Sequence, residues 1–263
     1  MGVLNYFTNL CNYLFWLSVS LKKITMKQIF ISLITLMSLT SFAQDAVIND
    51  NNAVKRTLSS SFDAIAVSDG INLYLTQGNE ESIAVSASDQ KYMENFKTEV
   101  VDGTLKIYFD HNGFNWVNTD KRKLKAYVSF KTLEKLRGSS GASVIMKSIL
   151  ISDKLESKFT SGARFEGQVK IGELEMSQNS GSSVDISGTT EKLDVDVNSG
   201  AIFKGYELTV DYCEAKASSG GGVRVNVKKE LSAKANSGGG IHYKGDGVIK
   251  DLDVNSGGQV KRS

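Results

Sequence analysis

Five acidic residues recur through the second half of the chain at steps of 19, 19, 20 and 37 residues. They are Glu156, Glu175, Asp194, Glu214 and Asp251. If the fold repeats with the same period, these carboxylates form a row. Such a row could bind calcium, which prefers hard oxygen ligands, bind a sugar, or supply the paired acids of a glycosidase. They are therefore the candidate binding residues of this chain.

Lysines occur two positions further on in three of the repeats, at Lys158, Lys216 and Lys234. Lysines next to acids on neighbouring strands form cross-strand pairs that neutralise the row. We therefore favour a solvated, salt-paired surface over a calcium or catalytic site, and we predict no metal site.

Histidine and cysteine offer little further chemistry. His111 and His242 lie far apart, and neither has a partner at the spacing of a zinc site. Cys213 stands where other repeats carry leucine, which indicates a buried small hydrophobe rather than an exposed nucleophile. No glycine-rich phosphate motif precedes a helix pattern. The sequence thus predicts no catalytic residue and no cofactor.

The composition excludes several classes of protein. The 263 residues are 41% hydrophobic, which argues against disorder, and they include 24 glycines, 2 cysteines and no proline. The net charge is only +2, and the charged residues among residues 1–43 are all basic. The rest of the chain therefore has no excess of basic residues with which to neutralise phosphates, so we expect no nucleic-acid partner. Cys11 lies in a segment that we expect to be removed, so the sequence predicts no disulfide framework.

The N-terminus has the layout of a secretory signal peptide. Lys27 precedes an apolar run, and Ser41 and Ala43 are small residues at the positions of a cleavage site. We predict a start at Met26 and cleavage after Ala43, with residues 1–25 an upstream extension. A transmembrane helix in residues 1–25 is the alternative.

The chain after residue 43 divides into three predicted parts. They are a flexible lead-in (44–58), an N-terminal β region (59–136) and regular coils (137–263).

Seven Ser-Gly dipeptides give the repeat its frame. Their glycines are Gly141, Gly162, Gly181, Gly200, Gly220, Gly238 and Gly257. Apolar residues alternate with polar ones on both sides of each dipeptide, as in Leu193, Val195 and Val197. Alternation with period two predicts strands with one buried face, joined by a bend at the dipeptide.

One repeat of about 19 residues cannot bury its own apolar face, so the repeats must stack. The predicted fold is an all-β, right-handed parallel β-helix, or β-solenoid, with a less regular N-terminal β region. The right hand follows from the usual handedness of parallel crossovers. In that N-terminal region, Asp102-Gly103 between alternating runs predicts a two-residue hairpin, and residues 111–120 a loop.

The Gly70-Ile71-Asn72 triplet, the following strand, the Asp-Gly hairpin and the seven coils together resemble the head GIN domain family. This family of autotransporter adhesins is common in Bacteroidetes, and the resemblance covers about residues 60–260. It implies a β-helical fold and an exported protein, and it supplies no catalytic residues.

The leading interpretation is a non-enzymatic exported protein that presents an elongated face for binding. We expect its partner to be a glycan or another envelope protein, in the periplasm, on the outer-membrane surface or outside the cell. The alternative is a polysaccharide lyase or hydrolase on a β-helix scaffold. The coils carry scattered aromatics, such as Tyr206 and Tyr212, rather than a lined groove. The edge of the last coil could also pair with a second copy, because its strand groups would be open.

Overall fold

The computed structural model describes residues 50–112 and 121–263. The predicted signal peptide, start at Met26 and cleavage after Ala43, and most of the predicted 111–120 loop, lie outside the described residues. The described part contains seventeen strands and one 3₁₀ helix, and no helix in it is long and apolar enough to cross a membrane.

The N-terminal β region contains β1 to β8 and the 3₁₀ helix. Their bounds are β1 Val54–Arg56, β2 Ala64–Val67, β3 Asn72–Gln77, β4 Ser82–Ser86, η1 Gln90–Tyr92, β5 Phe96–Val101, β6 Thr104–Phe109, β7 Lys125–Phe130 and β8 Lys135–Gly138. The regular coils contain β9 Ser143–Met146, β10 Leu150–Phe159, β11 Arg164–Gln178, β12 Ser183–Val197, β13 Ile202–Ala217, β14 Gly222–Ala235, β15 Gly240–Lys244, β16 Val248–Val254 and β17 Gln259–Arg262.

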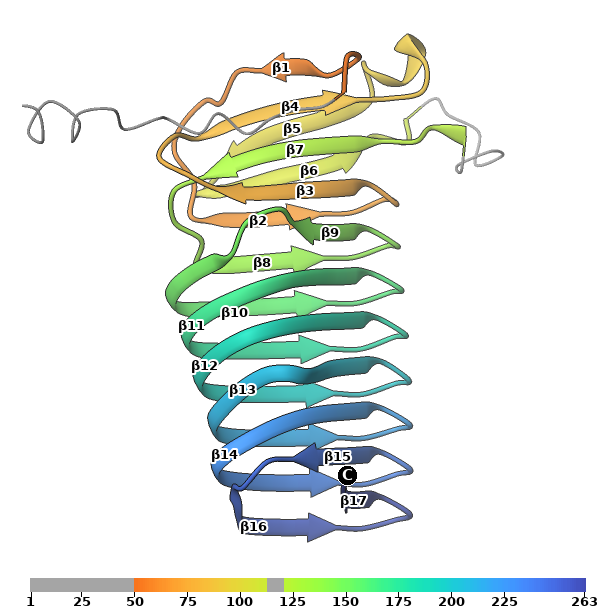
Figure 1. The fold of residues 1–263 in the computed structure, drawn as a ribbon. Helices are drawn as coiled ribbons and strands as arrows, with labels where there is room; N and C mark the ends of the chain where they lie inside the picture. The colour runs from red at the N-terminus through yellow and green to blue at the C-terminus, as the bar shows by residue number, and fades with distance from the viewer. Residues whose placement is uncertain (1–49, 113–120) are drawn as a thin grey trace, which may run out of the picture. The chain divides into compact units, whose positions relative to one another are not determined.

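The coils stack in parallel with a spacing of about 19 residues, as the repeat predicted. Strands β11 to β14 each run from one Ser-Gly turn to the next, and they pair in parallel in that order. Shorter strands continue the stack, with β9 and β10 paired to β11, and β15 and β16 paired to β14. Figure 1 shows each coil as two legs joined at the turn. We call the leg that enters the turn the incoming leg and the leg that leaves it the outgoing leg. The predicted β-solenoid is confirmed.

The interior of the solenoid is filled by the alternate apolar residues of both legs. Leu193, Val195 and Val197 on the incoming leg are at most 2% exposed, and Phe203 on the outgoing leg is fully buried. Equivalent residues stack in register, as Leu193 does on Cys213. Because inward and outward residues alternate, this packing fixes which side chains form the outer faces.

The turns have the same backbone conformation in every coil. The seven turn serines have φ between 47° and 54°, and the glycines that follow have φ between 70° and 76°. In every coil but the last, the glycine N–H donates to the serine carbonyl of the next coil, as Gly181 does to Ser199. The glycines accept this left-handed conformation without steric cost, whereas the serines do not.

The N-terminal region joins the regular coils through β3, which pairs in parallel with β9, and through β8, which pairs in parallel with β2 and with β10. The pairs β1–β4, β4–β7 and β5–β6 are antiparallel instead, and β5–β6 is the hairpin predicted at Asp102-Gly103.

The predicted flexible lead-in, residues 44–58, is wrong for its described part. Residues Val54–Arg56 form β1, and the Asp50 carboxylate accepts hydrogen bonds from Ser86 and Tyr127. The sequence gives no sign of this docking because the segment is polar and its partners lie far along the chain.

Candidate functional site: the acidic row

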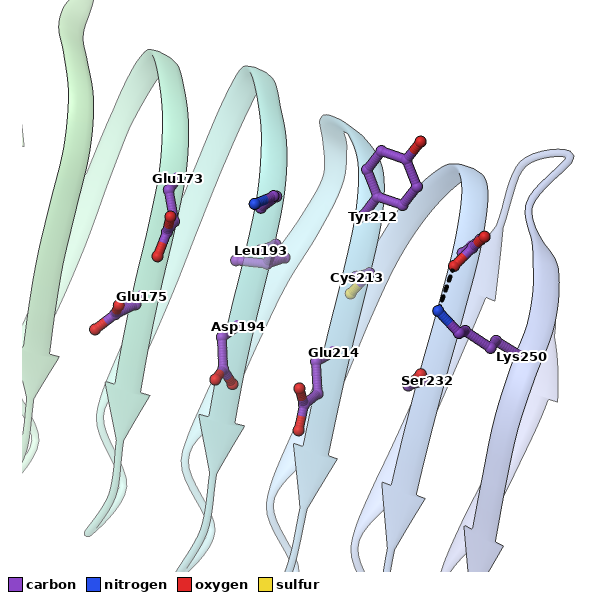
Figure 2. Close-up of a pocket in the computed structure, with 11 residues that line it drawn as sticks. Glu173, Glu175, Leu193, Asp194, Tyr212, Cys213, Glu214, Ser232 and Lys250 are labelled. Carbon is purple, nitrogen blue, oxygen red and sulfur yellow. Dashed lines mark hydrogen bonds and ion pairs between the residues drawn. The ribbon is translucent and has the colours of Figure 1, made fainter.

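The structure brings four of the five candidate carboxylates onto neighbouring strands. Glu156 pairs with Glu175, Glu175 with Asp194, and Asp194 with Glu214, across β10 to β13. Asp251 lies one further step away, because Ser232 on β14 stands between it and Glu214. We call this ladder the acidic row: Glu156, Glu175, Asp194, Glu214, Ser232 and Asp251. Figure 2 shows its central part crossing successive strands.

The burial of the core positions these side chains on the surface. Leu193 and Cys213 point inward, so Asp194 and Glu214, the next residues along their strands, must point outward. Adjacent strands are about 4.8 Å apart, so neighbouring carboxylates of the row stand close enough to repel each other.

Lysines and an arginine neutralise part of the row. The Lys216 ammonium lies 2.7 Å from Glu214 and 4.0 Å from Asp194. Lys154 lies 2.5 Å from Glu175, and Arg137 lies 3.4 Å from Glu156. The expected salt-paired surface is therefore present around these residues.

Two of the three lysines named from the sequence do not contribute to it. Lys234 pairs with Asp253 at 2.9 Å rather than with the row, and within the described residues Lys158 has no ion pair. Lys154, which sequence reasoning missed, lies two positions before the row, where the sequence could have shown it.

Asp194 stands at the centre of the row, where ionisation of its carboxyl group is unfavourable. Burial raises the pKa of its carboxyl group above the ordinary value, and the neighbouring carboxylates Glu214 and Glu175 raise it further. Lys216 opposes this shift, and its own pKa is raised mainly by the hydrogen bond to Glu214. The centre of the row is thus short of positive charge.

A second column of side chains runs beside the row. Glu173, Lys192, Tyr212 and Glu230 pair in that order across β11 to β14. This column and the part of the acidic row from Glu175 to Ser232 line a shallow depression of about 380 Å³, whose floor includes Leu193 and Cys213. Figure 2 shows the ring of Tyr212 standing beside it.

Tyr212 supplies an aromatic face at this depression. The residue is 39% exposed, and the Lys229 ammonium lies 5.1 Å from the centre of its ring. The sequence suggested only scattered aromatics, yet the position of Tyr212 in the repeat, two residues before Glu214, places it against the acidic row.

The other residues with potential chemistry lie elsewhere. His111 Nε2 stands 3.4 Å from Asp69 in the N-terminal region, and His242 lies on the outgoing leg of β15. Cys213 is 4% exposed, and burial strongly raises the pKa of its thiol, so its assignment to the core is confirmed. Over the described ranges, no cluster of three or more His, Cys, Asp and Glu residues could hold a metal ion.

Comparison with known protein families shows which family the chain belongs to. A family model described as "Putative auto-transporter adhesin, head GIN domain" matches residues 61–247. The chain belongs to this family. In this head GIN domain, Asp69 and Gly70 take the place of Ser-Gly, with φ of 62° and 69°, and Ile71 is fully buried. The triplet is therefore the first turn of the solenoid frame.

Solved structures show the same fold. A putative adhesin from Bacteroides fragilis has a TM-score of 0.72 at 18% identity, over 81% of this chain and 98% of its own. A putative adhesin from Parabacteroides distasonis has a TM-score of 0.63 at 20% identity, with the same coverage. A putative lipid binding protein from that organism has a TM-score of 0.55 at 18% identity, again over 81% and 98%. No curated protein sequence matches this head GIN domain chain.

Proposed function

We propose that the chain is an exported, non-enzymatic, adhesin-like protein that binds a neutral glycan on the depression between the acidic row and Tyr212. Membership of an auto-transporter adhesin family supports an exported or surface protein with an adhesin-like role. The observation that carries the ligand class is the in-register pairing of Asp194 with Glu214 beside the exposed ring of Tyr212.

A glycan satisfies both parts of this surface. Ionised carboxylates can only accept hydrogen bonds, so a ligand must bring donors, and sugar hydroxyl groups are donors. The ring of Tyr212 offers an apolar face on which the C–H face of a pyranose can pack, and its hydroxyl group offers a further hydrogen bond. The open form of the depression suits a chain that passes across it rather than a small ligand enclosed by protein.

Binding to an array of neutral glycans, followed by calorimetry with the best ligand, tests the proposal. Tyr212→Ala and Asp194→Asn should each weaken binding at least tenfold. Tyr108→Ala and Glu166→Gln are the matched controls, because Tyr108 lies on β6 and Glu166 on an outgoing leg, and they should leave binding unchanged. Equal losses in all four variants, or no neutral glycan bound, would count against the site.

The same assay separates binding from catalysis. New reducing ends or unsaturated products, lost in both Asp194→Asn and Glu214→Gln, would replace the proposal with the alternative of a polysaccharide-acting enzyme. We expect the bound glycan to remain intact.

A further inference from the structure

Three charged basic side chains and a histidine form a continuous column on the outgoing legs of the last coils. Lys204 on β13 pairs with Arg224 on β14, Arg224 pairs with His242 on β15, and His242 pairs with Lys261 on β17. Lys204, Arg224 and His242 point outward, because their neighbours Phe203, Val223 and Ile241 are fully buried. Lys261 is exposed and continues the same column. We call these four residues the basic ladder: Lys204, Arg224, His242 and Lys261.

The basic ladder lacks the counter-charges that the acidic row has. Lys204 lies 3.5 Å from Asp185 at one end of the ladder. Arg224, His242 and Lys261 have no ion pair among residues 50–112 and 121–263. Like charges placed directly opposite each other on neighbouring strands destabilise a sheet, and Lys204 and Arg224 stand opposite each other in this way. A bound anion would relieve this repulsion.

The surface on one side of the basic ladder is flat and open. Gly222 and Gly240 pair with each other beside Arg224 and His242, and a Cβ atom placed on either glycine would meet nothing within 4 Å. A ribbon-like ligand can therefore approach the backbone of two successive coils here.

Tyr206 borders the other side of this surface. Its hydroxyl group lies 2.7 Å from the Ser263 hydroxyl, and the Lys244 ammonium lies 5.4 Å from the centre of its ring. Because Ser263 directly follows β17, Tyr206 spans from β13 to the end of the basic ladder. It adds an aromatic wall, whereas the Lys244 ammonium is already paired with Glu207 at 3.3 Å.

The spacing of the basic ladder indicates the kind of anion. Adjacent strands repeat at about 4.8 Å, so the cations form a linear array along the solenoid axis. One pyranose unit of an extended polysaccharide has a similar length, so a chain with one carboxylate per unit matches the array. We propose that the basic ladder binds an extended polyuronate, with its sugar rings over Gly222 and Gly240 and its carboxylates toward the cations.

This surface is distinct from the depression at the acidic row, and the proposal does not depend on neutral-glycan binding there. Single-stranded nucleic acid fits it less well, because sequence-tolerant binding of single strands relies on several aromatic side chains that stack on bases. The aromatic wall at the basic ladder is the ring of Tyr206. A lipid surface fits less well too, since it offers no array of anions at a fixed repeat.

Calorimetry with polygalacturonate oligomers at low salt tests the proposal. Purified protein should bind the hexamer more tightly than the dimer, because only the longer chain spans all four residues of the basic ladder. Arg224→Gln combined with Lys261→Gln should weaken hexamer binding at least tenfold. The control pair Lys158→Gln with Lys234→Gln removes the same charge from incoming legs and should weaken it less than twofold.

Circular dichroism and thermal melting of both double variants show that they remain folded, so a loss of binding reports on the surface. Binding of neutral glycan at the acidic row should be unchanged in the Arg224/Lys261 variant. Absence of hexamer binding, or equal loss in the control pair, would overturn the proposal. So would binding of oligo-dT or of vesicles with anionic headgroups that is as tight as hexamer binding and equally sensitive to the Arg224/Lys261 pair.

Discussion

Asp194 and Glu214 lie directly opposite each other on β12 and β13, and one ammonium group, that of Lys216, serves both at 4.0 Å and 2.7 Å. One cation between two carboxylates leaves a net negative charge at this point. Glu175 on the next strand adds to it. This net negative charge at the centre of the acidic row therefore lowers the stability of the fold. A ligand that donates hydrogen bonds to these carboxylates would gain the most binding free energy there.

The first prediction concerns the stability cost of Asp194. Because the pKa of this carboxyl group is raised in the folded protein, its ionisation above that pKa opposes folding. Asp194→Asn should therefore raise Tm at pH 7 by about 1–3 °C. The gain should shrink as the pH falls through the folded pKa and vanish below about pH 4, where the carboxyl is protonated in both states.

Thermal melting between pH 3 and pH 8 checks this. Asp196→Asn, an exposed carboxylate two residues further along the same strand, is the control and should change Tm by less than 1 °C. A lower Tm for Asp194→Asn at pH 7 would mean that the contact with Lys216 outweighs burial and repulsion.

Much of the solenoid could be predicted from the sequence because the repeat is local. The dipeptides at Gly141 through Gly257 mark every turn, and the alternation around them fixes which residues face inward. Once the frame is known, register follows, so the neighbours Glu175, Asp194 and Glu214 could be read from their positions. The same arithmetic would have shown Tyr212 beside them and the basic ladder on the outgoing leg.

The remainder depends on contacts that no local pattern encodes. Asp50 is fixed by Ser86 and Tyr127, which are 36 and 77 residues away in the sequence. The partition of Lys216 between Glu214 and Asp194 depends on side-chain reach rather than on register. The antiparallel pairing of β4 with β7 likewise joins segments that share no repeat.

The second prediction concerns acid stability at Asp50. Hydrogen bonds from Ser86 and Tyr127 lower the pKa of this carboxyl to about 2. A carboxyl with a depressed pKa stabilises the fold above its unfolded pKa, and this contribution is lost as the pH falls from about 4 toward 2. Asp50→Asn should cost about 2 kcal/mol at pH 7 and close to nothing at pH 2.

Urea unfolding at a series of pH values measures this difference. Glu94→Gln, an exposed carboxylate in the same region, is the control and should change the free energy of unfolding by less than about 0.5 kcal/mol. A penalty for Asp50→Asn that is the same at pH 2 and pH 7 would show that the carboxylate charge is not the stabilising feature.

The third prediction concerns the thiol of Cys213. This side chain is stacked between Leu193 and Leu231 in the core, and burial raises the pKa of its thiol. A thiol reagent should therefore modify it in native protein far more slowly than in urea-unfolded protein, since the thiolate is the reacting form. Cys213→Ser should lower the free energy of unfolding by about 1–3 kcal/mol, because a hydroxyl is left in an apolar site. Native protein that reacts as fast as free cysteine would contradict the core assignment.

The last prediction concerns the left-handed serines of the turns. Ser199 has φ of 52°, a conformation that asparagine tolerates better than other side chains and that β-branched residues strongly disfavour. Ser199→Asn should raise the free energy of unfolding by about 0.5 kcal/mol, and Ser199→Val should lower it by about 1–2 kcal/mol. Because the Ser199 side chain is exposed, packing changes little, and the backbone conformation accounts for both effects.

The matched control is Ser183→Val on β12, where extended backbone accommodates valine and the substitution should be neutral or stabilising. Chemical denaturation of the three variants measures the differences, and valine penalties of equal size at positions 183 and 199 would show that the turn conformation is not their cause.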